Sequence, residues 1–207
     1  MKFTGFESAD FDLFLVGGLE ERMTFLKEQL RPKFHIFGEQ LASPLSEITG
    51  FKMFPHVAQH ARRKTNPPDD SWVAFAANTR GYKMMPHFQI CVWNTSVLVQ
   101  WGIIYEAKNK AKFSDNLLLH IDEVKTVIPD HFQWCKDHMK PEGQLHGEMT
   151  ETDFQLFADR LKNNKNGEVM VGRVIPREDA LNMSAKELYD ATLEAWGKLN
   201  YLHQLAI

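Results

Sequence analysis

The sequence predicts an α+β protein in which an antiparallel β-sheet meander packs with helices from both ends of the chain. Three observations lead to this class. Helical periodicities occupy both ends, β-compatible segments separated by turns occupy the middle, and 43% hydrophobic residues, with 15 Phe and 5 Trp, can form a large core. We therefore expect residues 1–207 to fold as a single compact domain without disulfide or metal support.

Three helices are expected before the sheet. Ser8 is a suitable N-cap for a short helix that Gly17 ends. Residues 19–30 repeat leucine and methionine at helical spacing, and Pro32 should stop this helix and open the next. That third helix should end at Pro44, because proline has no backbone N–H to continue it.

The middle of the chain predicts three consecutive strands. Residues 71–77, 82–93 and 97–105 are rich in β-branched and aromatic side chains. Residues 78–81 and 94–96 between them have the composition of turns. Short turns between neighbouring strands indicate an antiparallel meander.

The C-terminal half alternates helices and short strands. Ser114 should cap a helix that Pro129 ends, and residues 132–134 indicate a short strand. Two capping boxes mark further helices, with a strand at residues 168–175 between them. The boxes are Thr150 with Asp153 and Ser184 with Glu187.

Two pentapeptides, at residues 10–14 and 153–157, resemble each other near predicted helix starts. A weak internal duplication would explain the likeness. Amphipathic helix starts converge on such patterns, however, and the flanking residues do not align. One domain over the whole chain therefore stays the expectation.

Charge and cysteine usage restrict the class of protein. The net charge of −3 argues against a protein that coats nucleic acid with its whole surface. Residues 56–89, called the basic block below, nevertheless carry +3 without histidine. Cys91 and Cys135 lack CxxC spacing, which predicts reduced thiols in the cytoplasm, with a disulfide between them as the alternative. No segment approaches the roughly 20 apolar residues of a membrane helix, and no phosphate-loop, Rossmann or α/β-hydrolase motif occurs.

The basic block opens with two histidines that can act together. His56 and His60 are four residues apart, so they share a face in a helix, beside Arg63, or in a strand, beside Arg62. Such a pair can bind a metal ion, but Val57 stands where an HExxH zinc site needs glutamate. The sequence therefore predicts no metal ion and no cofactor.

Antiparallel register across the turn at residues 94–96 divides the next two strands into two faces. It places Gln89 opposite Gln100 and His87 opposite Gly102. The apolar residues of both strands then share the core face. His87, Gln89, Gln100 and Glu106 share the other face. Because glycine leaves space beside His87, this second face predicts a ligand-binding floor, with an ordinary solvent-exposed face as the alternative.

Arg80 and Lys83 lie at one end of the predicted floor. A partly buried arginine needs either an acidic partner or an anionic ligand. A salt-bridge network within the protein and a phosphate or carboxylate site are therefore equal alternatives. Asp137 beside His138 resembles an orienting pair for acid/base chemistry. The acids available for a network are Asp69, Asp70, Glu106 and Asp137.

Several ordered motifs give the chain a resemblance to a known family. The motifs are GLEERM, HVAQHARRKTNPPDDSW, RGYKMMPHFQI, WGIIYE and DHMKP. Together they resemble the YktB-like family of uncharacterised bacterial proteins, from about Phe6 to the final helix. The resemblance implies a compact α+β protein of the cytosol of Gram-positive bacteria. It implies no activity, so no catalytic residue is carried over.

These observations lead to one main hypothesis and two alternatives. The main hypothesis is a site for an anionic or nucleotide-like small molecule, with His60 and His87 as the weak candidates for proton transfer. One alternative is a module that binds single-stranded nucleic acid through the basic block and its aromatic residues Trp72, Tyr82, Phe88 and Trp93. The other is a purely structural polar network. The sequence specifies neither an enzymatic activity nor an oligomeric state. The candidate ligand-binding residues are His56, His60, Arg62, Arg63, Arg80, Lys83, His87, Gln89 and Gln100.

Overall fold

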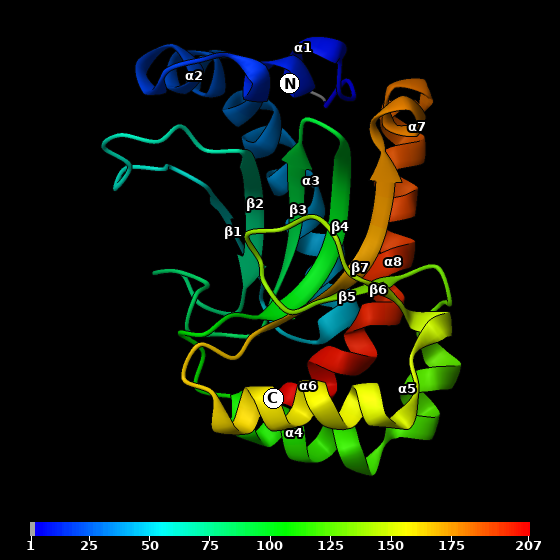
Figure 1. Cartoon of the computed structure of the whole chain (residues 1–207). Helices are drawn as coiled ribbons and strands as arrows, with labels where there is room; N and C mark the ends of the chain where they lie inside the picture. The colour runs from blue at the N-terminus through cyan, green and yellow to red at the C-terminus, as the bar shows by residue number, and fades with distance from the viewer. Residues whose placement is uncertain (1–2) are drawn as a thin grey trace.

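A seven-stranded antiparallel sheet forms the centre of the molecule (Figure 1). The structure is a computed structural model that describes residues 3–207, and it confirms the α+β class. The strands follow the order β1-β2-β3-β4-β7-β5-β6 across the sheet. Their bounds are β1 Phe54–Val57, β2 Asp70–Ala76, β3 His87–Trp93, β4 Ser96–Ile103, β5 Gln133–Cys135, β6 Gln144–Leu145 and β7 Val169–Pro176.

Helices pack at both ends of the sheet and against one of its faces (Figure 1). Three come before the sheet, three lie between β4 and β7, and two end the chain. Their bounds are α1 Ser8–Asp12, α2 Leu19–Phe25, α3 Arg31–Thr49, α4 Lys110–Leu119, α5 Ile121–Val127, α6 Glu151–Asn163, α7 Arg177–Asn182 and α8 Ala185–Ala206. Shorter turns of helix are η1 Leu13–Leu15, the π-helical η2 Leu26–Leu30 and η3 His146–Glu148.

The core lies between one face of the sheet and the helices α3 and α8. Trp196 of α8 joins the two layers, because its ring centroid lies 5.0 Å from that of Phe75 and 5.7 Å from that of Phe88. The predicted core face of β3 and β4 is confirmed, since every member is fully buried. Its members are Phe88, Ile90, Val92, Val97, Val99, Trp101 and Ile103.

The predicted register of β3 and β4 is also confirmed. Gln89 pairs with Gln100, and His87 pairs with Gly102. Because side chains alternate along a strand, these residues point away from α3 and α8. The second face of the sheet is thus the place for a polar site.

The third helix does not end at Pro44, and that prediction is wrong. α3 continues to Thr49, with Pro44 in its interior. Phe37, Leu41 and Leu45 form a fully buried stripe that runs past the proline. Burial of one such side chain contributes about 1.5–3 kcal/mol, which offsets the roughly 3 kcal/mol cost of an interior proline.

The helix does not stop at Pro32 as predicted. Instead, the chain changes from a π-helix to an α-helix next to this residue. α2 leads through the π-helical η2 directly into α3, with Pro32 in the first turn of α3. A proline ring collides with the carbonyl four residues earlier in a regular helix. The wider turn of η2 moves that carbonyl, so the chain stays helical.

Two predicted caps are wrong. α1 is capped by Glu7, which forms a capping box with Asp10, and not by Ser8. Ser114 lies inside α4, where its hydroxyl donates a hydrogen bond to the carbonyl of Ala158 in α6 at 2.8 Å. A tertiary hydrogen bond therefore takes the place of the expected cap.

The expected helix up to Pro129 is two helices, since α4 and α5 are separated at His120. The two capping boxes of the C-terminal half are confirmed. Thr150 accepts from the amide of Asp153, and Ser184 accepts from that of Glu187.

The strand expected at residues 82–93 is shorter than predicted. β3 begins only at His87, directly after Pro86. The residues before it form a turn in which the amide of Met85 donates to the carbonyl of Tyr82 at 2.9 Å. This turn directs Tyr82 towards the polar face of the sheet.

Candidate functional site

The polar face of the sheet contains a small, partly enclosed cavity. β2 and β3 form its floor, because their register pairs Trp72 with Cys91 and Ala74 with Gln89. Its walls come from the loop between β2 and β3 and from the loop after β5. The cavity has a volume of about 40 Å³ and is lined by Asp70, Trp72, Tyr82, Lys83, His87, Gln89, Ile104 and His138.

Asp70 brings a buried carboxyl group to this cavity. Its side chain is 3% exposed, and Oδ2 accepts a hydrogen bond from the Cys91 thiol at 3.2 Å. Oδ1 is buried and has no hydrogen-bond partner among residues 3–207. Burial raises the pKa of Asp70 to about 6, although the hydrogen bond from Cys91 and the positive charges of His138 and Arg63 oppose the rise. At neutral pH a carboxylate with one unsatisfied oxygen therefore faces the cavity.

His87 supplies a second acceptor. The ring is fully buried, and Nδ1 lies 3.1 Å from the carbonyl oxygen of Met85. A carbonyl oxygen only accepts, so Nδ1 carries the proton and Nε2 keeps a lone pair. Burial lowers the pKa of His87 to about 4, so the ring is neutral at pH 7.

His87 Nε2 is likewise buried without a partner in the described part of the chain. We call it, together with Asp70 Oδ1, the open acceptors. Buried polar atoms are paired in the large majority of cases, so each exception calls for an explanation. Both exceptions belong to residues that line one small cavity, so a ligand group or water in that cavity can supply their partners.

Tyr82 closes the cavity from the loop between β2 and β3. Its hydroxyl accepts a hydrogen bond from the indole N–H of Trp72 at 2.9 Å. Its ring packs on His87, with centroids 4.8 Å apart. Burial raises the pKa of Tyr82, so the hydroxyl keeps its proton.

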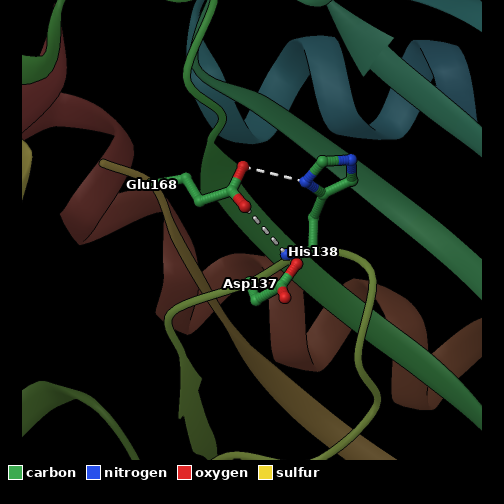
Figure 2. A group of neighbouring side chains, drawn as sticks. All are labelled: Asp137, His138 and Glu168. Atoms are coloured by element: carbon green, nitrogen blue, oxygen red, sulfur yellow. Dashed lines mark hydrogen bonds and ion pairs between the residues drawn. The ribbon is translucent and has the colours of Figure 1, made fainter. Parts of the chain in front are cut away.

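His138 enters the cavity wall from the loop after β5, and Glu168 fixes its ring (Figure 2). Nδ1 of His138 lies 2.8 Å from Glu168 Oε2, and the backbone amide of His138 donates to Oε1 at 3.3 Å. Burial disfavours the charged imidazolium, but the hydrogen bond and the charge of Glu168 outweigh this effect and raise the pKa of His138. The orienting carboxylate is thus Glu168, whereas Asp137 accepts from the amide of Met139 at 2.9 Å.

The Glu168→Gln variant should lower the pKa of His138, because the amide removes the negative charge that favours the imidazolium. A raised histidine pKa stabilises the fold below about pH 6.5, and this contribution is lost as pH rises through the folded value. The variant should therefore lose more stability at pH 6 than at pH 9. The pKa is measured from the ring-proton NMR signal of His138.

A matched control is Glu123→Gln, which removes the carboxylate 3.7 Å from His120 in an exposed pair. It should leave the His138 signal unchanged. An unchanged pKa of His138 in Glu168→Gln would show that Glu168 does not govern this ring.

One group of side chains has the spacing of a metal site. Within residues 3–207, Asp137, His138 and Glu168 have ligand atoms that all lie within 4.8 Å of one another (Figure 2). These groups are already paired through the His138–Glu168 hydrogen bond. Asp70, His87 and His138 do not form such a group in the same part of the chain.

The two histidines that open the basic block do not lie on one element. His56 is in β1, and its Nε2 lies 2.8 Å from the carbonyl oxygen of Asn78. His60 lies beyond the strand with a φ of 50°, and its Nε2 lies 3.1 Å from the Ser71 hydroxyl. The prediction of a shared face is therefore wrong. Burial lowers the pKa of His60 to about 4.

The four cations of the predicted site lie outside the cavity or at its rim. Arg63 donates to the carbonyl of Pro67 at 3.2 Å, and Lys83 pairs with Glu106 at 3.4 Å. Arg62 and Arg80 are exposed. Asp69 pairs with none of these, since it lies 3.3 Å from Arg22 in α2. The predicted salt-bridge network thus exists only as separate contacts.

An outer cleft adjoins the cavity, because Tyr82 and Lys83 line both. It has a volume of about 480 Å³ and is open to solvent. Its two cations are Arg80 and Lys83, with no acid among the lining residues. The residues that line it are Asn78, Arg80, Gly81, Tyr82, Lys83 and Met84.

The open space expected beside His87 at Gly102 is absent, and that prediction is wrong. A Cβ at Gly102 would lie 2.2 Å from the sulfur of Met170, which fills the position from β7. Gln89 and Gln100 are both buried, which rules out an ordinary solvent-exposed face. Of these two, only Gln89 lines the cavity.

Several residues of the cavity were not among the predicted site residues. Asp70 and Trp72 alternate along β2, so the turn at residues 78–81 and the period of 2 could have placed both on the polar face. The pairing of His138 with Glu168, 30 positions apart, left no local signal. Cys91 and Cys135 are free thiols within residues 3–207, and Cys91 serves as a hydrogen-bond donor to Asp70.

The fold and the cavity define an α+β protein that carries a buried polar pocket on the face of an antiparallel sheet opposite α3 and α8. The chain belongs to the family described as Domain of unknown function (DUF1054), whose model matches residues 6–203. This confirms the YktB-like resemblance.

Similar proteins carry the name UPF0637 protein. One from Bacillus velezensis is 43% identical over 200 residues, covering 97% of this chain and 95% of that protein. One from Bacillus cereus is 46% identical over 182 residues, covering 88% of each chain. Among residues 3–207, no helix combines the length and apolar character needed to cross a membrane.

Proposed function

We propose that this protein binds a small nucleotide-like molecule, with one polar end in the cavity and its anionic part in the outer cleft. The observation that carries the proposal is the pair of open acceptors, Asp70 Oδ1 and His87 Nε2. An unsatisfied buried polar group costs about 1–3 kcal/mol. A ligand that pairs with both atoms recovers that cost when it binds.

The surrounding charges support an anionic ligand body. Arg80 and Lys83 line the outer cleft, and the charge of Arg63 reaches Asp70 at the cavity itself. The charge of Arg62 is close enough to Tyr105 to favour its ionised form. The ring centroid of Tyr105 in turn lies 6.4 Å from that of His138. A phosphate in the cleft would thus meet Arg80, which is exposed, and Lys83, where it would compete with Glu106 for the ammonium group.

Single-stranded nucleic acid is the weaker alternative. Base stacking needs exposed aromatic faces. Phe88 is fully buried in the core, and Trp93 is 8% exposed. The indole N–H of Trp72 donates a hydrogen bond to the hydroxyl of Tyr82, so both side chains are held at the cavity. The aromatic residues of the basic block therefore do not offer a row of stacking positions.

Isothermal titration calorimetry at low ionic strength tests the proposal, with AMP, CMP, GMP and inorganic phosphate as probes. At least one nucleotide should bind with a single site. Arg80→Ala and Lys83→Ala should each weaken that binding about tenfold, because a charge-assisted hydrogen bond contributes about 1.5–3 kcal/mol. Lys198→Ala, an exposed cation on α8, is the control and should bind as the unmodified protein does.

Two results would contradict the proposal. If none of the probes binds, the proposal that the protein binds a nucleotide-like ligand is wrong. Nucleotide binding that Arg80→Ala and Lys83→Ala leave unchanged would place the anion elsewhere.

A further inference from the structure

The open acceptors restrict the chemistry of the group that enters the cavity. Nδ1 of His87 donates to the Met85 carbonyl, which leaves Nε2 as an acceptor. Oδ1 of Asp70 belongs to a carboxylate, which only accepts when ionised. Both atoms therefore require hydrogen-bond donors from whatever occupies the cavity.

An anion is the wrong occupant for this space. A phosphate or carboxylate placed against Asp70 Oδ1 and His87 Nε2 would meet a negative charge and a lone pair with no proton between them. The two cations of the wall that could compensate are already paired, Lys83 with Glu106 at 3.4 Å and protonated His138 with Glu168 at 2.8 Å. The uncharged donors in the wall include the hydroxyl of Tyr82 and the side-chain amide of Gln89.

The size of the cavity limits the occupant further. Its volume is about 40 Å³. One water takes about 30 Å³ in the liquid, so the space admits a group of only a few heavy atoms. A whole nucleobase cannot enter, but the nitrogen-bearing end of a larger molecule can.

We infer that the group entering the cavity is a nitrogen donor, either an amino, ammonium or amidinium group, that donates to Asp70 Oδ1, with His87 Nε2 as a second acceptor in the cavity wall. The inference rests on the proposed function and narrows its ligands to molecules with such a group at one end and an anion at the other. Within residues 3–207, Asp70 and His87 belong to no group of three side chains with metal-ligand spacing, and a group with N–H bonds supplies the donors that both acceptors lack.

Small probes of equal shape test this inference directly. Acetamidinium and acetate have the same planar heavy-atom skeleton, but the first offers N–H donors and the second only acceptors. Each is titrated into the protein at pH 7.5 while the ring-proton NMR signals of His87 and His138 are followed. Acetamidinium should shift both signals saturably, and acetate should not.

Two variants form a matched pair for the experiment. Asp70→Asn keeps the shape of the side chain and removes its charge, so acetamidinium binding should weaken at least tenfold. Asp69→Asn alters the neighbouring carboxylate, which is exposed and pairs with Arg22, and should leave the binding unchanged.

The outcomes separate the inference from the proposed function. Saturable shifts with acetate or inorganic phosphate, and none with acetamidinium, would overturn the inference and leave the proposed function in place. Tight binding of Zn²⁺ that depends on Asp70 and His87, without acetamidinium binding, would also overturn it. If no probe and none of the nucleotides shifts these signals, water alone fills the cavity and both proposals fail.

Discussion

The Asp70→Asn variant should be more stable than the unmodified protein at pH 8, by about 2–3 kcal/mol in the free energy of unfolding. Burial raises the pKa of Asp70 from 3.8 to about 6. A folded pKa above the unfolded value means that the charged form costs stability as pH rises from about 4 through 6. Two pKa units correspond to about 3 kcal/mol, and asparagine removes this cost while its carbonyl still accepts from Cys91.

Denaturant unfolding at several pH values measures this effect. The stability gain should disappear at pH 3.5, where Asp70 is protonated in both states. Asp69→Asn is the control, since that carboxylate is largely exposed and its pair with Arg22 contributes little. A loss of stability in Asp70→Asn at pH 8 would contradict the ligand site and favour a structural network, because there the carboxylate would stabilise the fold.

The Gly172→Ala variant should lose about 3 kcal/mol of stability, the upper end of the usual cost of overpacking. Gly172 lies in β7 between Gln100 of β4 and Gln133 of β5. A Cβ at this position would lie 2.2 Å from the carbonyl oxygen of Val99. That atom belongs to the backbone of a central strand, so the collision is relieved only by moving β4 away from β7.

Thermal and denaturant unfolding test this prediction, with Gly197→Ala as the matched control. Gly197 is exposed in α8, and outside its own helix backbone no heavy atom among residues 3–207 lies within 4 Å of the place that a Cβ would take. Alanine there should stabilise the protein by roughly 0.5–1 kcal/mol. Equal effects of the two substitutions would contradict the close approach of β4 and β7.

Local patterns were sufficient for much of the sheet and for the C-terminal helices. Alternation of apolar and polar residues placed His87 opposite Gly102, and the side-chain chemistry of Ser184 and Glu187 identified the start of α8. Both depend on residues close in sequence. Pro44 was misjudged because the buried stripe of α3 outweighs a local helix-breaking preference.

The candidate site was located only in part. His87, Gln89 and Lys83 line the cavity as the basic block suggested. Asp70 was considered as a partner for an arginine, whereas its contact is Cys91 in β3. The pairing of Glu168 with His138 depends on how two loops meet, which no periodicity encodes.

The central claim is that a ligand nitrogen satisfies Asp70 Oδ1. The most direct test is the electron density of a crystal grown with AMP. The density should show a nitrogen of AMP within about 3.2 Å of Asp70 Oδ1, and its phosphate beside Arg80 and Lys83. Water alone beside Asp70 Oδ1, with AMP bound elsewhere or not at all, would contradict the claim.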